Sequence, residues 1–500
     1  MKTIAAAAVY FILLLLTGCG EQSQQGLATQ PAVEEGGLLR AAGNPDSEAL
    51  VWFIKAGATG HGRDRSSPFG STAQVEHASR PGDIIFLLSA DEPLDDGLTL
   101  KPRQTLIGVA PESGQYPLLS NTTGDRNSGH GLILADGVRV EGIEVRNTHA
   151  SGIFGVDPGN VELSDVVVSN ANTAQLTMPD RPTYLDYTLT HGGIVLLGSS
   201  AGETASLKLT RTRVFGSSGL GVVAAAYAGA RVSLNLLDSE IRDGTAIDRA
   251  DRGVYAFAHG ASSTVDLEVI RSTVSGRMGR YGRNISLQAS RDATVSGLVY
   301  ESSVGASGQD GINAGLLELP ASVDLSIVGS TIENSAQSNI EGTMLALPHD
   351  EAAASASRLS ISIDRSTIRR AGRTPYVRAD HFNILMTGSP TPPDHPLPRG
   401  QYRLSVIDSE IAASQEAGLW VGAPWGGEPI DPGQFEILVR GTQFLENETA
   451  DIQIGASAVE IDARQNCWLS PDGREEARVI TTSPADDGTV DTSDSVPCGR

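Results

Sequence analysis

The sequence predicts an all-β fold, a single solenoid wound as a right-handed parallel β-helix over residues 49–470. Three observations predict it. A short pattern of alternating apolar residues recurs along the chain, a Gly, Asn or Asp follows most copies at a fixed distance, and no apolar stretch with a helical period separates the copies. Length does not set the number of domains here, because a repeat can extend one domain without limit.

The repeat is clearest when its copies are aligned on their last residue, as in Val138-Arg-Val-Glu-Gly-Ile-Glu-Val145. Each copy reads apolar-x-apolar, then a short polar step often containing Ser or Thr, then x-apolar, which is the period of two of a β-strand. We call the last residue of each copy its anchor. The anchors are Val145, Val168, Val214, Ile241, Val274, Val304, Ile332, Ile368, Ile411 and Phe444.

A turn position follows each anchor. In six coils it comes seven residues later, at Gly152, Gly221, Gly311, Asn339, Gly418 and Asp451. These residue types enter left-handed backbone conformations most readily, so we expect a left-handed turn at this position. In four coils it comes later, at Gly193, Gly253, Asn284 and Asn383. Because every coil leaves the same strand edge here, the four insertions should protrude from one face, where binding usually resides.

The first part of the solenoid carries a cap. Ser71-Thr-Ala-Gln74 is a capping box for a short helix that would cover the open end of the core. With the segments Val51–Lys55, Pro81–Ile85 and Gln104–Gly108, the repeat resembles the pectate-lyase-like superfamily of right-handed parallel β-helices. The resemblance implies the fold, but this architecture carries lyases, hydrolases, adhesins and inert spikes, so it implies little about function.

The N-terminus predicts export. An apolar run from Ile4 to Leu16, too short to span a bilayer, leads to Leu16-Thr17-Gly18-Cys19, which resembles a bacterial lipobox. The resemblance implies a signal peptide over residues 1–18, acylation of Cys19, and a lipid-anchored protein of the bacterial cell envelope. Resemblance to sorted lipoproteins further implies that Gly20, rather than Asp, after the acylated cysteine favours the outer membrane, where the cell has one, or the cell surface. Residues 19–48 lack a hydrophobic period and should form a flexible tether.

Two cysteines lie near the C-terminus, in and beyond the last coil. An exported location permits Cys467 and Cys498 to form a disulfide, which would close residues 471–500 as a tail. The alternative is a pair of free thiols.

The charge pattern points to a class of ligand. A net charge of −23 argues against nucleic acid, which requires a basic field. The insertion loops 242–252, 275–283 and 369–382 reverse this sign, with ten arginines against four aspartates, a sum of +6. Guanidinium groups beside Tyr281 suit a sugar ring that bears carboxylate or sulfate. The alternative is a set of solvated turns.

The order of the coils predicts a trough. The short-turned coils ending at Val304 and Ile332 lie between long-looped ones, and three coil steps of ~4.8 Å would make a trough roughly 14 Å wide. One extended polysaccharide strand would fit. Its predicted floor is Gln309, Asp310, Glu333, Asn334 and Gln337.

The superfamily resemblance implies a way to cleave such a ligand. A lyase of this kind uses an Arg or Lys base, so Arg280 or Arg283 is the candidate base and Tyr281 the candidate acid. Candidate substrate-binding residues are Arg249, Arg252, Arg277, Arg373, Gln309, Asp310, Asn334 and Gln337. Candidate calcium ligands are Asp248, Asp251 and Asp310, for which pairing with arginine is the alternative. A hydrolase is less favoured, because we found no pair of carboxylates on the trough floor.

Two functions therefore remain open. The first is an envelope-anchored protein that binds, or also cleaves, an acidic polysaccharide or cell-surface glycan through the arginine-rich face. The second is a non-catalytic adhesin or envelope scaffold.

Overall fold

The structure is a computed structural model that describes residues 49–110, 114–177, 190–245, 251–346, 356–372, 381–390, 400–422, 435–455, 459–481 and 489–498. The predicted signal peptide, the tether and Cys19 lie outside these residues. Among the residues described, no helix has both the length and the apolar character needed to cross a membrane.

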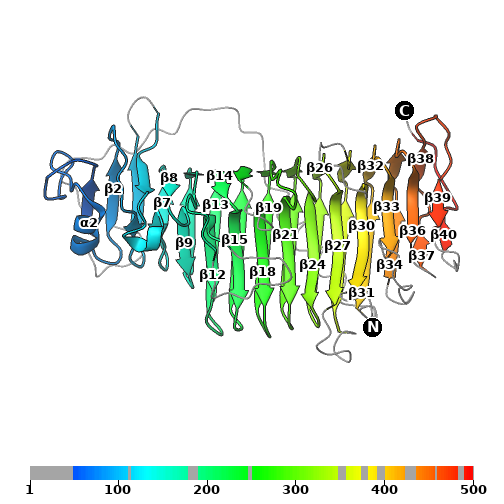
Figure 1. The fold of residues 1–500 in the computed structure, drawn as a ribbon, viewed down its shortest axis with the longest axis horizontal. Helices are drawn as coiled ribbons and strands as arrows, with labels where there is room; N and C mark the ends of the chain where they lie inside the picture. The colour runs from blue at the N-terminus through cyan, green and yellow to red at the C-terminus, as the bar shows by residue number, and fades with distance from the viewer. Residues whose placement is uncertain are drawn as a thin grey trace, which may run out of the picture. The chain divides into compact units, whose positions relative to one another are not determined.

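The described residues form a right-handed parallel β-helix, in which successive turns of the chain add strands to three parallel sheets (Figure 1). We name the sheets A, B and C and give their strands in spatial order. Sheet A contains β1 (Val51–Ile54), β2 (Ile84–Leu88), β4 (Thr105–Val109), β7 (Arg139–Glu141), β10 (Val161–Ser164), β13 (Thr204–Thr210), β16 (Arg231–Leu237), β19 (Thr264–Ile270), β22 (Thr294–Tyr300), β25 (Ser322–Val328), β28 (Arg358–Asp364), β31 (Gln401–Ile407), β34 (Phe435–Arg440), β37 (Glu460–Asp462) and β40 (Thr489–Asp491).

Sheet B contains β38 (Cys467–Leu469), β35 (Gln443–Leu445), β32 (Glu410–Ala412), β29 (Thr367–Arg369), β26 (Thr331–Glu333), β23 (Ser303–Val304), β20 (Thr273–Val274), β17 (Glu240–Thr245), β14 (Arg213–Ser218), β11 (Val167–Ser169), β8 (Glu144–Thr148) and β5 (Leu118–Asn121). Sheet C contains β3 (Leu98–Thr99), β6 (Leu132–Ile133), β9 (Ile153–Val156), β12 (Gly192–Gly198), β15 (Leu220–Tyr227), β18 (Arg252–His259), β21 (Arg283–Ser290), β24 (Ile312–Glu318), β27 (Ser338–Ala346), β30 (Phe382–Pro390), β33 (Ala417–Gly422), β36 (Ala450–Gly455) and β39 (Val479–Thr481).

The anchors form one ladder in sheet B, and the predicted register is confirmed. Each anchor lies directly opposite the next, as Val274 does to Val304 and Val304 to Ile332. All ten are fully buried in one continuous core. The apolar-x-apolar steps lie in sheet A, where residues alternate between core and surface as in β28. Stacking therefore buries a core that no single coil could bury alone.

The serine and threonine in the polar step have a structural role at the turn between sheets A and B. The hydroxyl of Ser302 accepts a hydrogen bond from the backbone N–H of Ser272 at 3.1 Å, and that of Ser330 accepts one from Ser302 at 3.0 Å. Ser366 and Ser409 continue the ladder. Buried backbone donors that no strand satisfies are thereby paired.

The predicted left-handed turn is displaced. None of the ten turn positions has a positive φ; left-handed residues lie instead three residues before the anchors, as at Arg271 (φ 45°), and two after them, as at Asn334 (φ 63°). The turn position selects glycine for space, because a Cβ at Gly152 would lie 2.4 Å from Val168. Where asparagine stands there, its amide donates to backbone carbonyls, as Asn383 does to Ala412 at 2.8 Å.

The two ends of the solenoid are closed differently. At the N-terminal end lies the predicted helix, α2 (Thr72–Ala78), whose Val75 enters the core; the Ser71 N–H donates to Gln74 Oε1 at 3.1 Å. A short 3-10 helix, η1 (Asn127–Gly129), precedes β6. At the other end β39 and β40 continue sheets C and A, so the solenoid extends past the predicted boundary at residue 470.

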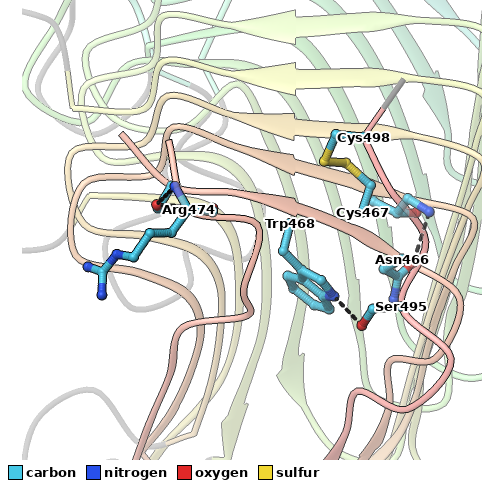
Figure 2. Close-up of a disulfide and its surroundings, with 8 residues drawn as sticks. Asn466, Cys467, Trp468, Arg474, Ser495 and Cys498 are labelled. Carbon is cyan, nitrogen blue, oxygen red and sulfur yellow. Dashed lines mark hydrogen bonds between the residues drawn. A yellow bond between two sulfur atoms is a disulfide. The ribbon is translucent and has the colours of Figure 1, made fainter. Parts of the chain in front are cut away.

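The predicted disulfide joins Cys467 of β38 to Cys498, with a Cα–Cα distance of 5.1 Å (Figure 2). Beside it the Trp468 indole N–H donates to the Ser495 hydroxyl at 3.1 Å. The final segment is therefore fastened to the last coil rather than forming a loose tail.

Candidate functional site

Sheet C differs from sheet A in that the central strands of sheet C are buried on both faces. Every residue of β21 and β24 is buried, including those whose side chains point away from the core. The outward residues are apolar toward one end, at Val195 and Val223, and again at Leu385 and Trp420. Between these, strands β18, β21, β24 and β27 lie in the middle of the solenoid (Figure 1). They carry a polar patch formed by Tyr255, Ser286, Asn313 and Glu341, one residue from each strand in direct register.

At the β27 end of this patch, Glu341 belongs to a cluster of three ionisable side chains, which we call the carboxyl cluster: Arg283, Asp310 and Glu341. Arg283 Nε donates to Asp310 Oδ2 at 2.8 Å, and its Nη2 donates to Glu341 Oε2 at 3.3 Å. The side chains are only 7%, 0% and 11% exposed. Truncating one partner of such a group leaves an uncompensated buried charge, which is strongly destabilising.

The surroundings of Glu341 shift its pKa in favour of the protonated form. Burial, reinforced by the nearby Asp310 carboxylate, raises the pKa of Glu341 to about 8, against the opposing effects of Arg283 and Asn313. Asp310 Oδ1 is buried and lacks a hydrogen-bond donor among the described residues. A proton on Glu341 would supply such a donor, so the two carboxyl groups can share one proton beside the same guanidinium group.

Amide and aromatic groups surround the carboxyl cluster. Asn313 Nδ2 donates to Glu341 Oε2 at 2.7 Å. Arg252 is the register neighbour of Arg283, and its guanidinium carbon lies 5.1 Å from the centre of the Tyr255 ring. Stacking on that ring offsets part of the repulsion between two neighbouring buried arginines. The structure thus brings together the predicted Arg252, Arg283 and Asp310.

Arg277 does not lie on the surface, as a ligand-contacting loop residue would. It is fully buried, and its Nη1 donates to the Gly219 carbonyl oxygen at 3.2 Å and lies 3.7 Å from Asp251 Oδ1. A Cβ at Gly244 would lie 1.6 Å from the same Nη1. Glycine at this position therefore leaves the space that the guanidinium group occupies. The loop composition could not reveal this inward turn.

The tip of the same loop is accessible. Arg280 is exposed, with its guanidinium carbon 5.4 Å from the centre of the half-buried Tyr281 ring.

The predicted floor residues divide into two groups. Gln309 directly precedes Asp310 of the carboxyl cluster in the sequence, and its Nε2 donates to Gln337 Oε1 on the next coil at 3.3 Å.

Asn334 belongs to a different part of the coil, at the end of β26. Its backbone N–H donates to the Arg369 carbonyl oxygen at 3.3 Å, and the neighbouring Glu333 accepts a hydrogen bond from Arg369 Nε at 2.8 Å. These two residues are engaged with the next coil rather than with the carboxyl cluster.

Arg249, Arg373 and Asp248 lie outside the described residues, as do the central parts of the predicted wall loops 242–252 and 369–382, whereas loop 275–283 is described throughout. The other two candidate calcium ligands each pair with an arginine: Asp251 with Arg277 and Asp310 with Arg283. Within the described part of the chain, no three His, Cys, Asp or Glu residues gather as a metal site would require. With Asp248 outside the described residues, calcium binding by these three aspartates stays a prediction.

Sequence reasoning missed Glu341, and with it the carboxylate pair. The signal was present, since Glu341 follows the inward Ile340 and must face outward by the period of two. Its partner Asp310 is one coil away and 31 positions earlier in the sequence (341 minus 310). Only the register of β24 against β27 brings the two together.

No protein-family model and no curated protein matches the chain. Solved structures with similar shapes include a pectate lyase (11% identity, 89% of this chain and 82% of that chain, TM-score 0.32). A lacto-N-biosidase from Eubacterium ramulus (9%, 90% and 68%, TM-score 0.37) and a mannuronan C-5 epimerase A-module from Azotobacter vinelandii (12%, 89% and 97%, TM-score 0.34) are also similar. These sequence identities and TM-scores are too low to assign an activity to this chain. Its description as a right-handed parallel β-helix is based on the register of its own strands.

Proposed function

We propose that this protein binds an acidic polysaccharide over the outward face of sheet C, at the carboxyl cluster and the adjoining loop 275–283. The observation that carries the proposal is the convergence of Arg283, Asp310 and Glu341 on one outward face. A polar, titratable patch with apolar residues to either side is the usual composition of a ligand site.

Two groups there suit an anionic sugar. A protonated Glu341 can donate to a uronate carboxylate, which an ionised glutamate would repel. The exposed Arg280 supplies a guanidinium fork for carboxylate or sulfate, beside the Tyr281 ring for the sugar face. In a chain of net charge −23, such local cationic groups are needed to bring an anionic polymer to the surface.

The spacing of the carboxyl groups disfavours hydrolysis. Glycosidases hold their two carboxyl groups ~5 Å or more apart, whereas Asp310 and Glu341 both pair with the single guanidinium group of Arg283. If the protein also cleaves its ligand, β-elimination is the chemistry we favour, because it needs one proton acceptor and one donor rather than two separated carboxylates.

The test is binding of the intact protein to polyuronate, sulfated and neutral polysaccharides at low and high salt. We expect affinity for the anionic polymers alone, weakened several-fold by Arg280→Gln and unchanged by Arg403→Gln, a control arginine on sheet A. Ultraviolet absorbance of the incubated polyuronate reports cleavage by elimination. If the folded protein binds none of these polymers, the alternative function, a non-catalytic adhesin or scaffold, is the better description.

We further propose that the protein is exported and lipid-anchored in the bacterial envelope. The disulfide supports an oxidising compartment, where such bonds persist. Cys19→Ala should abolish incorporation of labelled fatty acid and release the protein from membranes. A variant that stays fully with the membrane fraction would contradict the anchor.

A further inference from the structure

A chain of hydrogen bonds runs across four strands and ends at Glu341. The Tyr255 hydroxyl donates to Gln288 Oε1 at 2.7 Å, and Gln288 Nε2 donates to Asn313 Oδ1 at 3.2 Å. Asn313 Nδ2 then donates to Glu341 Oε2 at 2.7 Å. Ser286 adds a second donor to Asn313 Oδ1 at 3.2 Å. The members come from β18, β21, β24 and β27, and none is more than 9% exposed.

The chain has one direction, because each amide presents a donor on one side and an acceptor on the other. Oε2 of Glu341 receives two donors, from Asn313 and from Arg283, so it acts as an acceptor. With Nδ2 of Asn313 facing Glu341, its Oδ1 must face Gln288. Gln288 must then turn its amide nitrogen toward Asn313 and its oxygen toward Tyr255. The Tyr255 O–H completes the sequence as a donor.

We propose that Tyr255, Gln288 and Asn313 are positioning residues that fix Glu341 with Oε2 as acceptor and its proton on Oε1. Reversing either amide would place two acceptors or two donors face to face, which costs a buried hydrogen bond. The carboxylic acid is therefore presented in a single orientation, with its O–H directed to Asp310 or to an anionic ligand. The orientation of Glu341 is argued from these hydrogen bonds alone. Only its role in ligand binding rests on the proposed function.

The experiment titrates Glu341 without any ligand. The difference in thermal stability between the intact protein and Glu341→Gln, followed from pH 5.5 to 9, reports the protonation midpoint of Glu341. The same pair is measured in the Tyr255→Phe background, which keeps the ring beneath Arg252 and removes only the hydroxyl. We expect the midpoint to rise by ~0.5 unit or more, because the Asn313 donor that favours the charged form is no longer held in place.

Tyr300→Phe, on sheet A, is the matched control and should leave the midpoint unchanged. Gln288→Met provides a second break in the chain if Tyr255→Phe does not fold, and should raise the midpoint in the same way. An unchanged midpoint in a folded variant of either kind would overturn the proposal.

Polyuronate binding is measured on the same variants. A raised midpoint without any polyuronate binding by the parent protein would retain the positioning residues and reject the proposed function. Polyuronate binding by the parent protein together with an unchanged midpoint in the variants would retain the proposed function and reject the positioning residues.

Discussion

Replacing Glu341 by glutamine should make the protein relatively more stable as the pH rises. In the folded protein the pKa of Glu341 is about 8, against 4.5 for an ordinary glutamate. Between these values the folded state holds a proton that the unfolded state has lost. Stability from this group is therefore full below pH 4.5 and is lost as the pH rises through 8. The glutamine side chain of the Glu341→Gln variant is a neutral isostere that has no such dependence.

The magnitude follows from linkage. From pH 5.5 to pH 8 the parent should lose about 3 kcal/mol that Glu341→Gln does not lose, at ~1.36 kcal/mol per unit with flattening near the folded pKa. With an unfolding entropy of ~2.1 cal/mol/K per residue over roughly 450 residues, this is a change of about 3 °C in the difference between the two melting temperatures.

The assay is thermal unfolding of both proteins by circular dichroism at half-unit pH steps in one ionic strength. Asp324→Asn, an exposed substitution on sheet A, serves as the control, and its difference curve should be flat. A flat difference curve for Glu341→Gln as well would refute a proton held on Glu341 at neutral pH.

Three further predictions concern the scaffold. Ile332→Asp buries a carboxylate in the core and should cost several kcal/mol in urea unfolding; unchanged stability would mean that the anchor register is misplaced. Cys498→Ser opens a loop of 31 residues and should lower stability by roughly 3 to 4 kcal/mol, with no added effect of reductant on the variant. Arg277→Met should lower the free energy of unfolding by ~3 to 5 kcal/mol, because it leaves the buried Asp251 carboxylate without its cationic partner. Adding Asp251→Asn to this variant should restore much of the lost stability. Equal stability of the single and double variants would contradict the buried pair.

Much of the fold could be predicted because its determinants are local. The alternation that ends at each anchor specifies which side chains face the core, and a slip of one residue would expose all of them. The capping box at Ser71 is likewise a contact between residues three apart. These signals can be recognised in the linear sequence, so the register of the anchors Val274, Val304 and Ile332 was predicted correctly.

The candidate site was predicted only in part, because its contacts join different coils. Loop composition drew attention to Arg277, Arg280 and Arg283, but it does not distinguish an arginine that turns inward from one at the tip. The space that admits Arg277 is created by Gly221 and Gly244 on earlier coils. Glu341 was missed for the same reason, since its partners Asp310 and Arg283 are defined only once the coils are stacked.

The most direct test of glycan binding at the carboxyl cluster is hydrogen–deuterium exchange of the intact protein with and without a polyuronate oligosaccharide. We predict that backbone protection increases in residues 275–283 and 305–309 and in β27, while sheet A strands such as β28 are unchanged. Protection confined to other parts of the chain, or no change at a saturating concentration of ligand, would contradict binding at this face.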